Sequence, residues 1–198
     1  MEWSSISSFT IFALVAAFSP GPNNIMLAAS GANFGFRSTL PHITGICIGF
    51  CLLVFAAGYG ISGLFIEFPK IYSLLKVISV IFLIYLAWKI GSAGQSSKRE
   101  HNRPLRFWQA ALFQLVNPKV ISVIISSVTT YTGDAKVLSQ SIVTLVLIFA
   151  IVTLGATCTW TAFGVSIRNI LSKKKLLRSF NVLMAILLLI SLIPVTIL

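Results

Sequence analysis

The sequence predicts an all-α, polytopic membrane protein with about six transmembrane helices. Of its 198 residues, 57% are hydrophobic and only 10% are charged, whereas roughly 25% of the residues of a soluble domain are charged. Each crossing of a hydrocarbon core about 30 Å thick takes about 20 apolar residues, so six crossings with short loops use nearly the whole chain. We therefore expect residues 1–198 to form a single transmembrane domain embedded in a lipid bilayer.

Six long apolar segments account for the six predicted helices, and each is long enough to span a bilayer. They lie at approximately residues 6–31, 40–66, 71–91, 107–130, 138–165 and 179–197. In the second segment, Gly45 and Gly49 form a GxxxG pattern, which lets another helix approach closely. That helix could belong to the same chain or to a second copy, so a homo-oligomer stays open.

The charges between the segments predict the orientation, because Lys and Arg are retained on the cytoplasmic side. The loops around Arg37, residues 98–106 and residues 168–178 are positive, whereas the other loops and both ends are balanced, acidic or uncharged. Both termini should therefore face outward. This pattern also explains the net charge of +11 without nucleic acid, which would need the basic residues on one solvated face among base-stacking aromatics.

The first and fourth segments are each interrupted by a polar stretch containing proline, which removes a helical donor and clashes with a preceding carbonyl. The two stretches are Ser19-Pro20-Gly21-Pro22-Asn23-Asn24 and Asn117-Pro118-Lys119. Each break lies ten or eleven positions after the first aromatic residue of its segment. Equivalent depth in oppositely directed segments predicts an inverted 3+3 repeat, with repeat one at about residues 1–97 and repeat two at about 104–198.

Irregular backbone at membrane depth is tolerated only where protein or a water-filled cavity satisfies its polar groups. The ends of the half-helices then offer N–H and C=O groups to a polar ligand. We therefore predict one substrate-binding or gating site, made of Pro20, Gly21, Pro22, Asn23, Asn24, Asn117, Pro118 and Lys119. The amides suit a zwitterionic or neutral polar ligand, and the alternative is that both breaks are simple proline kinks with capping amides.

Lys119 and His42 are the titratable candidates for proton coupling, since no Asp or Glu lies in a helix centre. A charge at mid-depth costs roughly 3 kcal/mol, which makes it a functional-site hypothesis. Lys119 could snorkel, bond to carbonyls freed at the breaks, or meet a substrate carboxylate. His42 follows Pro41 near the cytoplasmic start of the second helix, where an interfacial histidine is the competing interpretation.

No enzyme, metal or cofactor is expected from this sequence. Cys47, Cys51 and Cys158 lie in apolar runs without metal-ligand spacing, and we find no nucleotide-binding loop. Two alternatives to a transporter remain. The first is a membrane thiol–disulfide electron carrier using Cys47 and Cys158, although neither cysteine borders its proline break. The second is a structural membrane subunit that transports nothing.

The chain resembles the lysine exporter (LysE/RhtB) family of amino-acid efflux carriers along essentially its whole length. The resemblance rests on Pro20-Gly21-Pro22-Asn23, Gly35-Phe36-Arg37, Tyr85-Leu86-Ala87-Trp88-Lys89 and Asn117-Pro118-Lys119. It implies export of amino acids or their derivatives across the bacterial cytoplasmic (inner) membrane, driven by the proton gradient. Asn23 stands where many members carry Asp, which resembles the cysteine and O-acetylserine branch and implies a small neutral substrate.

Overall fold

A computed structural model describes residues 3–61, 69–92, 103–132, 138–168, 170 and 174–191. Within these residues the regular structure is helical, as the composition predicts. The elements are α1 Trp3–Phe18, α2 Pro22–Phe34, α3 Phe36–Ala56, the π-helical turn η1 Ala57–Ile61, α5 Pro69–Gly91, α6 Phe107–Val116, α7 Pro118–Tyr131, α8 Leu138–Ile167 and α9 Lys174–Ile190.

Both predicted breaks are confirmed. The first apolar segment divides into α1 and α2, which are bent by 52° relative to each other, and the fourth divides into α6 and α7, bent by 63°. In each case a proline occupies the first turn of the second half-helix. Proline is tolerated there because the first N–H groups of a helix have no intrahelical partner.

Among the described residues, two helices are long and apolar enough to cross a membrane, and up to four spans result if each bent pair is counted as one. The two are α8 and the stretch Phe36–Gly60, which comprises α3 and most of η1. Only Val77–Gly91 of α5 counts as a shorter apolar helix. Residues 192–197 of the predicted sixth span lie outside the described residues, so the six-helix, 3+3 architecture stays a prediction.

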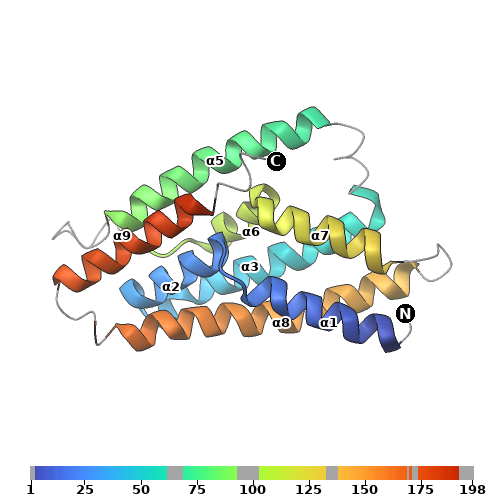
Figure 1. The fold of residues 1–198 in the computed structure, drawn as a ribbon, viewed down its shortest axis with the longest axis horizontal. Helices are drawn as coiled ribbons and strands as arrows, with labels where there is room; N and C mark the ends of the chain where they lie inside the picture. The colour runs from blue at the N-terminus through green and yellow to red at the C-terminus, as the bar shows by residue number, and fades with distance from the viewer. Residues whose placement is uncertain are drawn as a thin grey trace.

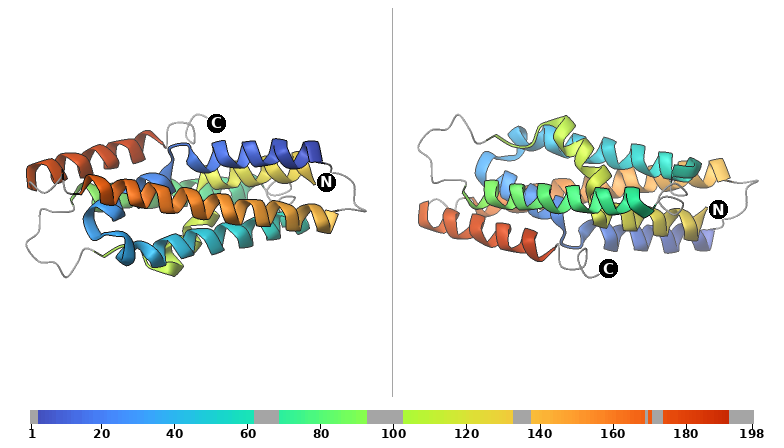
Figure 2. Two further views of the ribbon diagram at one scale, coloured as in Figure 1. Left: turned by 90° about the horizontal axis from the view of Figure 1, so that it is seen from below. Right: turned by 90° about the horizontal axis from the view of Figure 1, so that it is seen from above.

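The helices form an elongated bundle in which both breaks lie near the middle of its length (Figure 1). Helices α1 and α7 occupy one half of that length, and α2 and α6 occupy the other half (Figures 1 and 2). Helices α3 and α8 run alongside both halves, and α5 packs against α9. This arrangement brings the two broken backbones to the same level of the bundle.

Glycines permit the close packing of α3 on α6. A Cβ atom at Gly49 would lie 2.7 Å from the carbonyl oxygen of Ala111, and one at Gly45 would overlap the carbonyl oxygen of Phe107. Real Cβ atoms do not approach backbone atoms so closely, so both positions exclude any larger residue. The GxxxG pattern of the second segment therefore serves a contact within the chain, the first of its two predicted alternatives.

Basic residues occupy several helix ends that lie toward the end of the bundle opposite to the start of α1 (Figures 1 and 2). They lie in the first turns of α3 and α9, in the last turn of α5 and next to the ends of α6 and α8; they are Arg37, Lys89, Arg106, Arg168, Lys175 and Arg178. Trp88 in the last turn of α5 and Trp108 in the first turn of α6 are 71% and 72% exposed. Exposed tryptophans near helix ends are typical of a membrane interface. Which end faces the cytoplasm stays a prediction.

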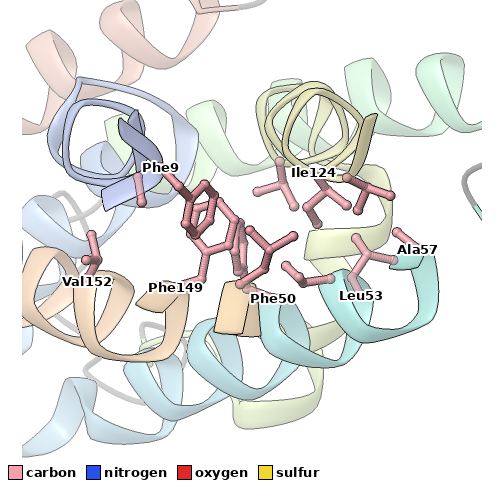
Figure 3. Packing of buried hydrophobic residues seen from close by; sticks show 12 residues of the cluster. Phe9, Phe50, Leu53, Ala57, Ile124, Phe149 and Val152 are labelled. Carbon is pink, nitrogen blue, oxygen red and sulfur yellow. The ribbon is translucent and has the colours of Figure 1, made fainter. Parts of the chain in front are cut away.

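A cluster of aromatic rings fills the half of the bundle that holds α1 and α7. The ring centroids of Phe9 and Phe149 lie 4.9 Å apart with perpendicular planes, and Phe50 and Phe149 are separated by the same distance. Tyr131 adds a further edge contact to Phe9 at 5.0 Å. Figure 3 shows Phe9, Phe149 and Phe50 as a row of contacting rings between α1, α8 and α3. This cluster closes one side of the cavity described next.

Candidate functional site

The two breaks meet at a cavity of about 50 Å³ in the interior of the bundle. A cavity needs roughly 10–15 Å³ of such volume to hold one water molecule, so this one is large enough for ordered water. Its apolar walls include Phe50 and Phe149 from the aromatic cluster. Its polar lining comes from α2, from the break between α6 and α7, and from α8: Asn23, Asn24, Asn117, Lys119, Thr153 and Thr157. Four of these six are predicted site residues.

Lys119 reaches across the cavity to the other break. Its Nζ atom donates hydrogen bonds of 2.8 Å to both the carbonyl oxygen and the Oγ atom of Ser19. The side chain passes directly over Gly21, where a Cβ atom would lie 2.8 Å from the Lys119 Cδ atom. Of the three predicted roles of Lys119, the bond to a freed carbonyl is therefore present, and it joins the two broken helices.

Asn24 caps the end of α1. Its Nδ2 atom donates to the carbonyl oxygen of Ala17 at 2.7 Å and to that of Ser19 at 2.9 Å. The Ala17 carbonyl is one of the last four of α1, which have no intrahelical partner, whereas the Ser19 carbonyl also accepts from Lys119. Asn24 is 5% exposed, so the cap is shielded from water. The capping role that we considered for the amides is confirmed at this position.

Asn23 pairs with a residue that sequence reasoning missed. Its Nδ2 atom donates to Oε1 of Gln114 at 2.8 Å, and the Gln114 Nε2 atom donates back to Asn23 Oδ1 at 3.3 Å. Gln114 lies in α6, is fully buried and also donates to the carbonyl oxygen of Ala110. A glutamine inside an apolar segment, three residues before the Asn117 break, was the signal that could have identified it.

The Asn23–Gln114 pair predicts strongly non-additive stability. In Asn23→Leu the buried Gln114 amide loses its partner, and in Gln114→Met the half-buried Asn23 amide does, which costs up to about 1–3 kcal/mol. The double variant removes both polar groups, so we expect it to be destabilised by clearly less than the sum of the two single effects. Thermal unfolding of the four purified proteins in detergent measures this coupling. Additive shifts in melting temperature would contradict the pairing.

Asn117 presents an unsatisfied acceptor at the second break. It ends α6, precedes Pro118 at the start of α7 and is 1% exposed. Within the described structure its Oδ1 atom has no hydrogen-bond partner. A buried polar atom without a partner is rare and calls for a water or a ligand. Because Asn117 lines the cavity, a donor held there would satisfy it.

The half-helices α2 and α7 both begin at the cavity. Their N-cap residues, Gly21 and Asn117, make no side-chain capping hydrogen bond. The first-turn N–H groups of each helix are therefore available, and each N-terminus carries a partial positive charge. Two such ends beside the Lys119 ammonium form an electropositive wall, which favours a carboxylate.

The other predicted residues take different positions. Pro22 and Pro118 begin the two half-helices, whereas Pro20 is exposed and does not line the cavity. His42 is 1% exposed in α3 and lines a separate cavity, so it is not grouped with Lys119. Its side chain is buried inside the protein, and its interfacial depth in the membrane stays a prediction.

The three cysteines are free thiols. The Cys47 Sγ atom lies 3.8 Å from Thr157 Oγ1, and Thr157 lines the cavity between the breaks. Among the described residues, no cluster of His, Cys, Asp or Glu could hold a metal ion.

Broken helices that meet at a cavity with polar groups are typical of membrane carriers for small molecules. The family model described as LysE type translocator matches residues 14–191, and the chain belongs to this family. It is therefore a multi-pass membrane protein of a bacterial efflux family, and it is not an enzyme.

Curated relatives cover most of the chain. A cysteine/O-acetylserine efflux protein of Escherichia coli O1:K1 is 29% identical over 185 residues, which are 92% of this chain and 93% of the relative. A protein of the same description from Salmonella paratyphi A is 30% identical over 161 residues, covering 80% and 82% of the two chains. No solved structure matches the chain significantly.

Proposed function

We propose that this protein exports small neutral amino acids or their derivatives, similar to cysteine and O-acetylserine, from the cytoplasm. The observation that carries the proposal is the cavity at the meeting point of the two breaks, which combines a cation, two helix N-termini and an unpartnered amide oxygen. The efflux proteins that the chain resembles over most of its length support the same substrate class.

The groups around the cavity match the two ends of a zwitterion. The substrate carboxylate would lie at the N-termini of α2 and α7 and accept a hydrogen bond from Lys119, whose ammonium has three donors, two of them used by Ser19. The substrate ammonium would donate to the free Oδ1 atom of Asn117. The side chain would then face the apolar walls.

The size of the cavity favours a small side chain. Phe50 and Phe149 limit it on one side, and both rings are buried in the aromatic cluster with Phe9. Among the described residues there is no Asp or Glu, so a second cationic group on the substrate would meet no counter-charge from them. A basic amino acid such as lysine would therefore be disfavoured.

The proposal includes the membrane arrangement that transport requires. Six crossings in an inverted 3+3 repeat would place both termini outside the bacterial cytoplasmic membrane and the breaks at mid-depth, where alternating access operates around a fixed site. Export would be driven by the proton gradient, with Lys119 and His42 as the titratable candidates. The opposite directions of the two bent pairs in the bundle support this repeat (Figure 1).

Export from intact cells tests the proposed function. Cells that overproduce the protein should release several times more of the substrate than control cells, and should resist its toxic analogues. The measurement is the release rate across a panel that includes cysteine, O-acetylserine, serine, threonine and lysine, with membrane levels matched by immunoblotting. Unchanged release of every amino acid in the panel would overturn the proposal, and increased release of lysine alone would overturn its substrate class.

A further inference from the structure

A second cavity of about 50 Å³ lies at the basic end of the bundle. It is enclosed by α2, the start of α3, the last turns of α5 and residues 103–105. Its polar and charged lining consists of Ser30, Asn33, His42, Lys89 and Arg103. The function proposed above uses none of these groups except His42, to which it assigns no ligand contact.

His42 brings two unsatisfied polar atoms to this cavity. The side chain is 1% exposed, and neither ring nitrogen has a hydrogen-bond partner in the described structure. A neutral imidazole has one N–H donor and one acceptor nitrogen, and buried groups of this kind are normally satisfied. Because His42 lines the cavity, a molecule held there can supply the missing partner.

Ser30 adds a second acceptor. The hydroxyl of Thr39 donates its only hydrogen to the carbonyl oxygen of Gly35 at 2.8 Å. The 2.8 Å contact between Ser30 Oγ and Thr39 Oγ1 must then use the hydrogen of Ser30. The lone pairs of the Ser30 oxygen remain available, and Ser30 lines the cavity.

Lys89 and Arg103 supply hydrogen-bond donors that carry positive charge. Both line the cavity, and both side chains offer only donors. No Asp or Glu occurs among the described residues, so none of them neutralises this pair. The cavity thus has cationic donors from α5 and residue 103, and neutral acceptors from α2 and α3.

The second cavity is aligned with the first along α2. Asn23 lines the first cavity, whereas Met26, Ser30 and Asn33 line the second. Spacings of three and four residues place these side chains on one helix face. At 1.5 Å of rise per residue, Ser30 lies about 10 Å from Asn23 along the helix axis. A solute leaving the second cavity along this face would next reach the Asn23–Gln114 pair.

We infer that the second cavity is a cytoplasm-side binding site for a zwitterionic amino acid, whose carboxylate contacts Lys89 and Arg103 and whose ammonium contacts Ser30 and His42. This inference rests on the proposed export function and adds an entry site to it. The substrate binds here first and then moves along α2 to the cavity between the breaks. Loss of this site therefore weakens capture from the cytoplasm and leaves the central site intact.

Exchange of radiolabelled cysteine in inside-out membrane vesicles tests the inference, because it exposes the cytoplasmic face and needs no driving force. The vesicles are preloaded with unlabelled cysteine under reducing conditions. In Lys89→Gln/Arg103→Gln, the half-saturating concentration should rise about tenfold, because charge-assisted hydrogen bonds are lost. The maximal exchange rate should stay within about twofold. The charge-conserving swap Lys89→Arg/Arg103→Lys should restore most of the affinity.

The matched control is Lys175→Gln/Arg178→Gln, which removes two positive charges from α9 at the same end of the bundle. We expect its half-saturating concentration to stay within about twofold of the wild-type value. If the double variant is not inserted, the single variants Lys89→Gln and Arg103→Gln provide the same comparison.

If the half-saturating concentration of Lys89→Gln/Arg103→Gln is unchanged, or rises equally in the control, the second site is overturned. The proposed function still stands in that case, provided that the wild-type protein exchanges cysteine. Absence of saturable exchange by the wild type, with cysteine and with the rest of the panel, would overturn both.

Discussion

Replacing Lys119 by methionine is expected to lower the export rate roughly 10- to 100-fold while leaving the protein folded in the membrane. The ammonium makes two hydrogen bonds to Ser19 across the breaks, and the proposed carboxylate contact would be a third. Of these three, only the substrate contact acts directly on the export rate, and losing one hydrogen bond to a charged group, worth about 1.5–3 kcal/mol, corresponds to roughly 10- to 100-fold. Methionine keeps much of the length and the apolar stem of the side chain.

Lys119→Met is not expected to destabilise the protein, although it lowers the export rate. Burying an ammonium in a bilayer interior is costly, so its replacement by a thioether should leave the melting temperature unchanged or raise it slightly. A purely structural role for Lys119 predicts the reverse, because the Ser19 carbonyl and hydroxyl would then lose an essential partner. Melting temperature and export are therefore measured on the same variant.

Two further variants sharpen this test. Ser19→Ala removes the Oγ acceptor but keeps the carbonyl acceptor, so it should reduce export only in part. Lys175→Met removes an exposed charge in the first turns of α9 and should leave export unchanged. Full export by Lys119→Met at wild-type membrane levels would refute the assignment of this residue to the transport site.

The breaks could be predicted from the sequence because proline acts locally: its missing N–H and its ring interrupt a helix whatever surrounds it. The partners across the breaks could not be predicted in the same way. Asn23 and Gln114 are 91 positions apart in the sequence. For Lys119 the sequence left three roles open, and the structure shows a hydrogen bond to the carbonyl of Ser19. Only the packing of α6 and α7 against the first bent pair selects among them.

Hydropathy also predicted the helix boundaries inaccurately. Hydropathy predicts a last segment from residue 179, whereas α9 begins at Lys174. The second segment likewise begins at Phe36 rather than at residue 40. Charged residues such as Arg37 and Arg178 lower the hydropathy at these ends, but lysine and arginine are good helix formers. The apolar pattern therefore underestimates these helices, because their backbone hydrogen bonds continue into the charged residues.

The sequence indicated glycines at close helix contacts only where two of them form a pattern in one segment. Gly45 and Gly49 stand four residues apart on one face of α3, and the sequence indicated a close helix contact there. Gly31 and Gly164 lie on different helices, so no spacing links them. Yet the structure places both at the crossing of α2 and α8, where each faces backbone atoms of the other helix.

Replacing Gly164 by alanine at that crossing has the largest expected effect on stability. A Cβ atom at Gly164 would overlap the carbonyl oxygen of Ala28, and would lie 2.9 Å from the Ala28 carbonyl carbon and 3.0 Å from the Ala32 nitrogen. All three atoms belong to the backbone of α2, which cannot rotate away as a side chain can. Gly164→Ala must therefore push α2 from α8, with a cost at or above the upper end of about 1–3 kcal/mol for overpacking.

The helix that would move also carries Asn23 and Asn24. Displacement of α2 would stretch the Asn23–Gln114 pair and the Asn24 cap on α1. We therefore expect Gly164→Ala to lower the melting temperature by at least about 5 °C, at about 2–4 °C per kcal/mol for a chain of this size. Export should fall with it, since the cavity between the breaks is bounded by the same helix.

Gly155→Ala is the matched control, because it makes the same substitution in the same helix. Apart from the backbone of its own helix, no atom of the described residues lies within 4 Å of a Cβ atom at Gly155. Alanine is also favoured over glycine in a helix by about 1 kcal/mol. The control should therefore be neutral or stabilising, although the chemical change is identical. Equal melting temperatures for the two variants would mean that α2 and α8 do not cross at Gly164, and the position of α2 beside the cavity would then be wrong.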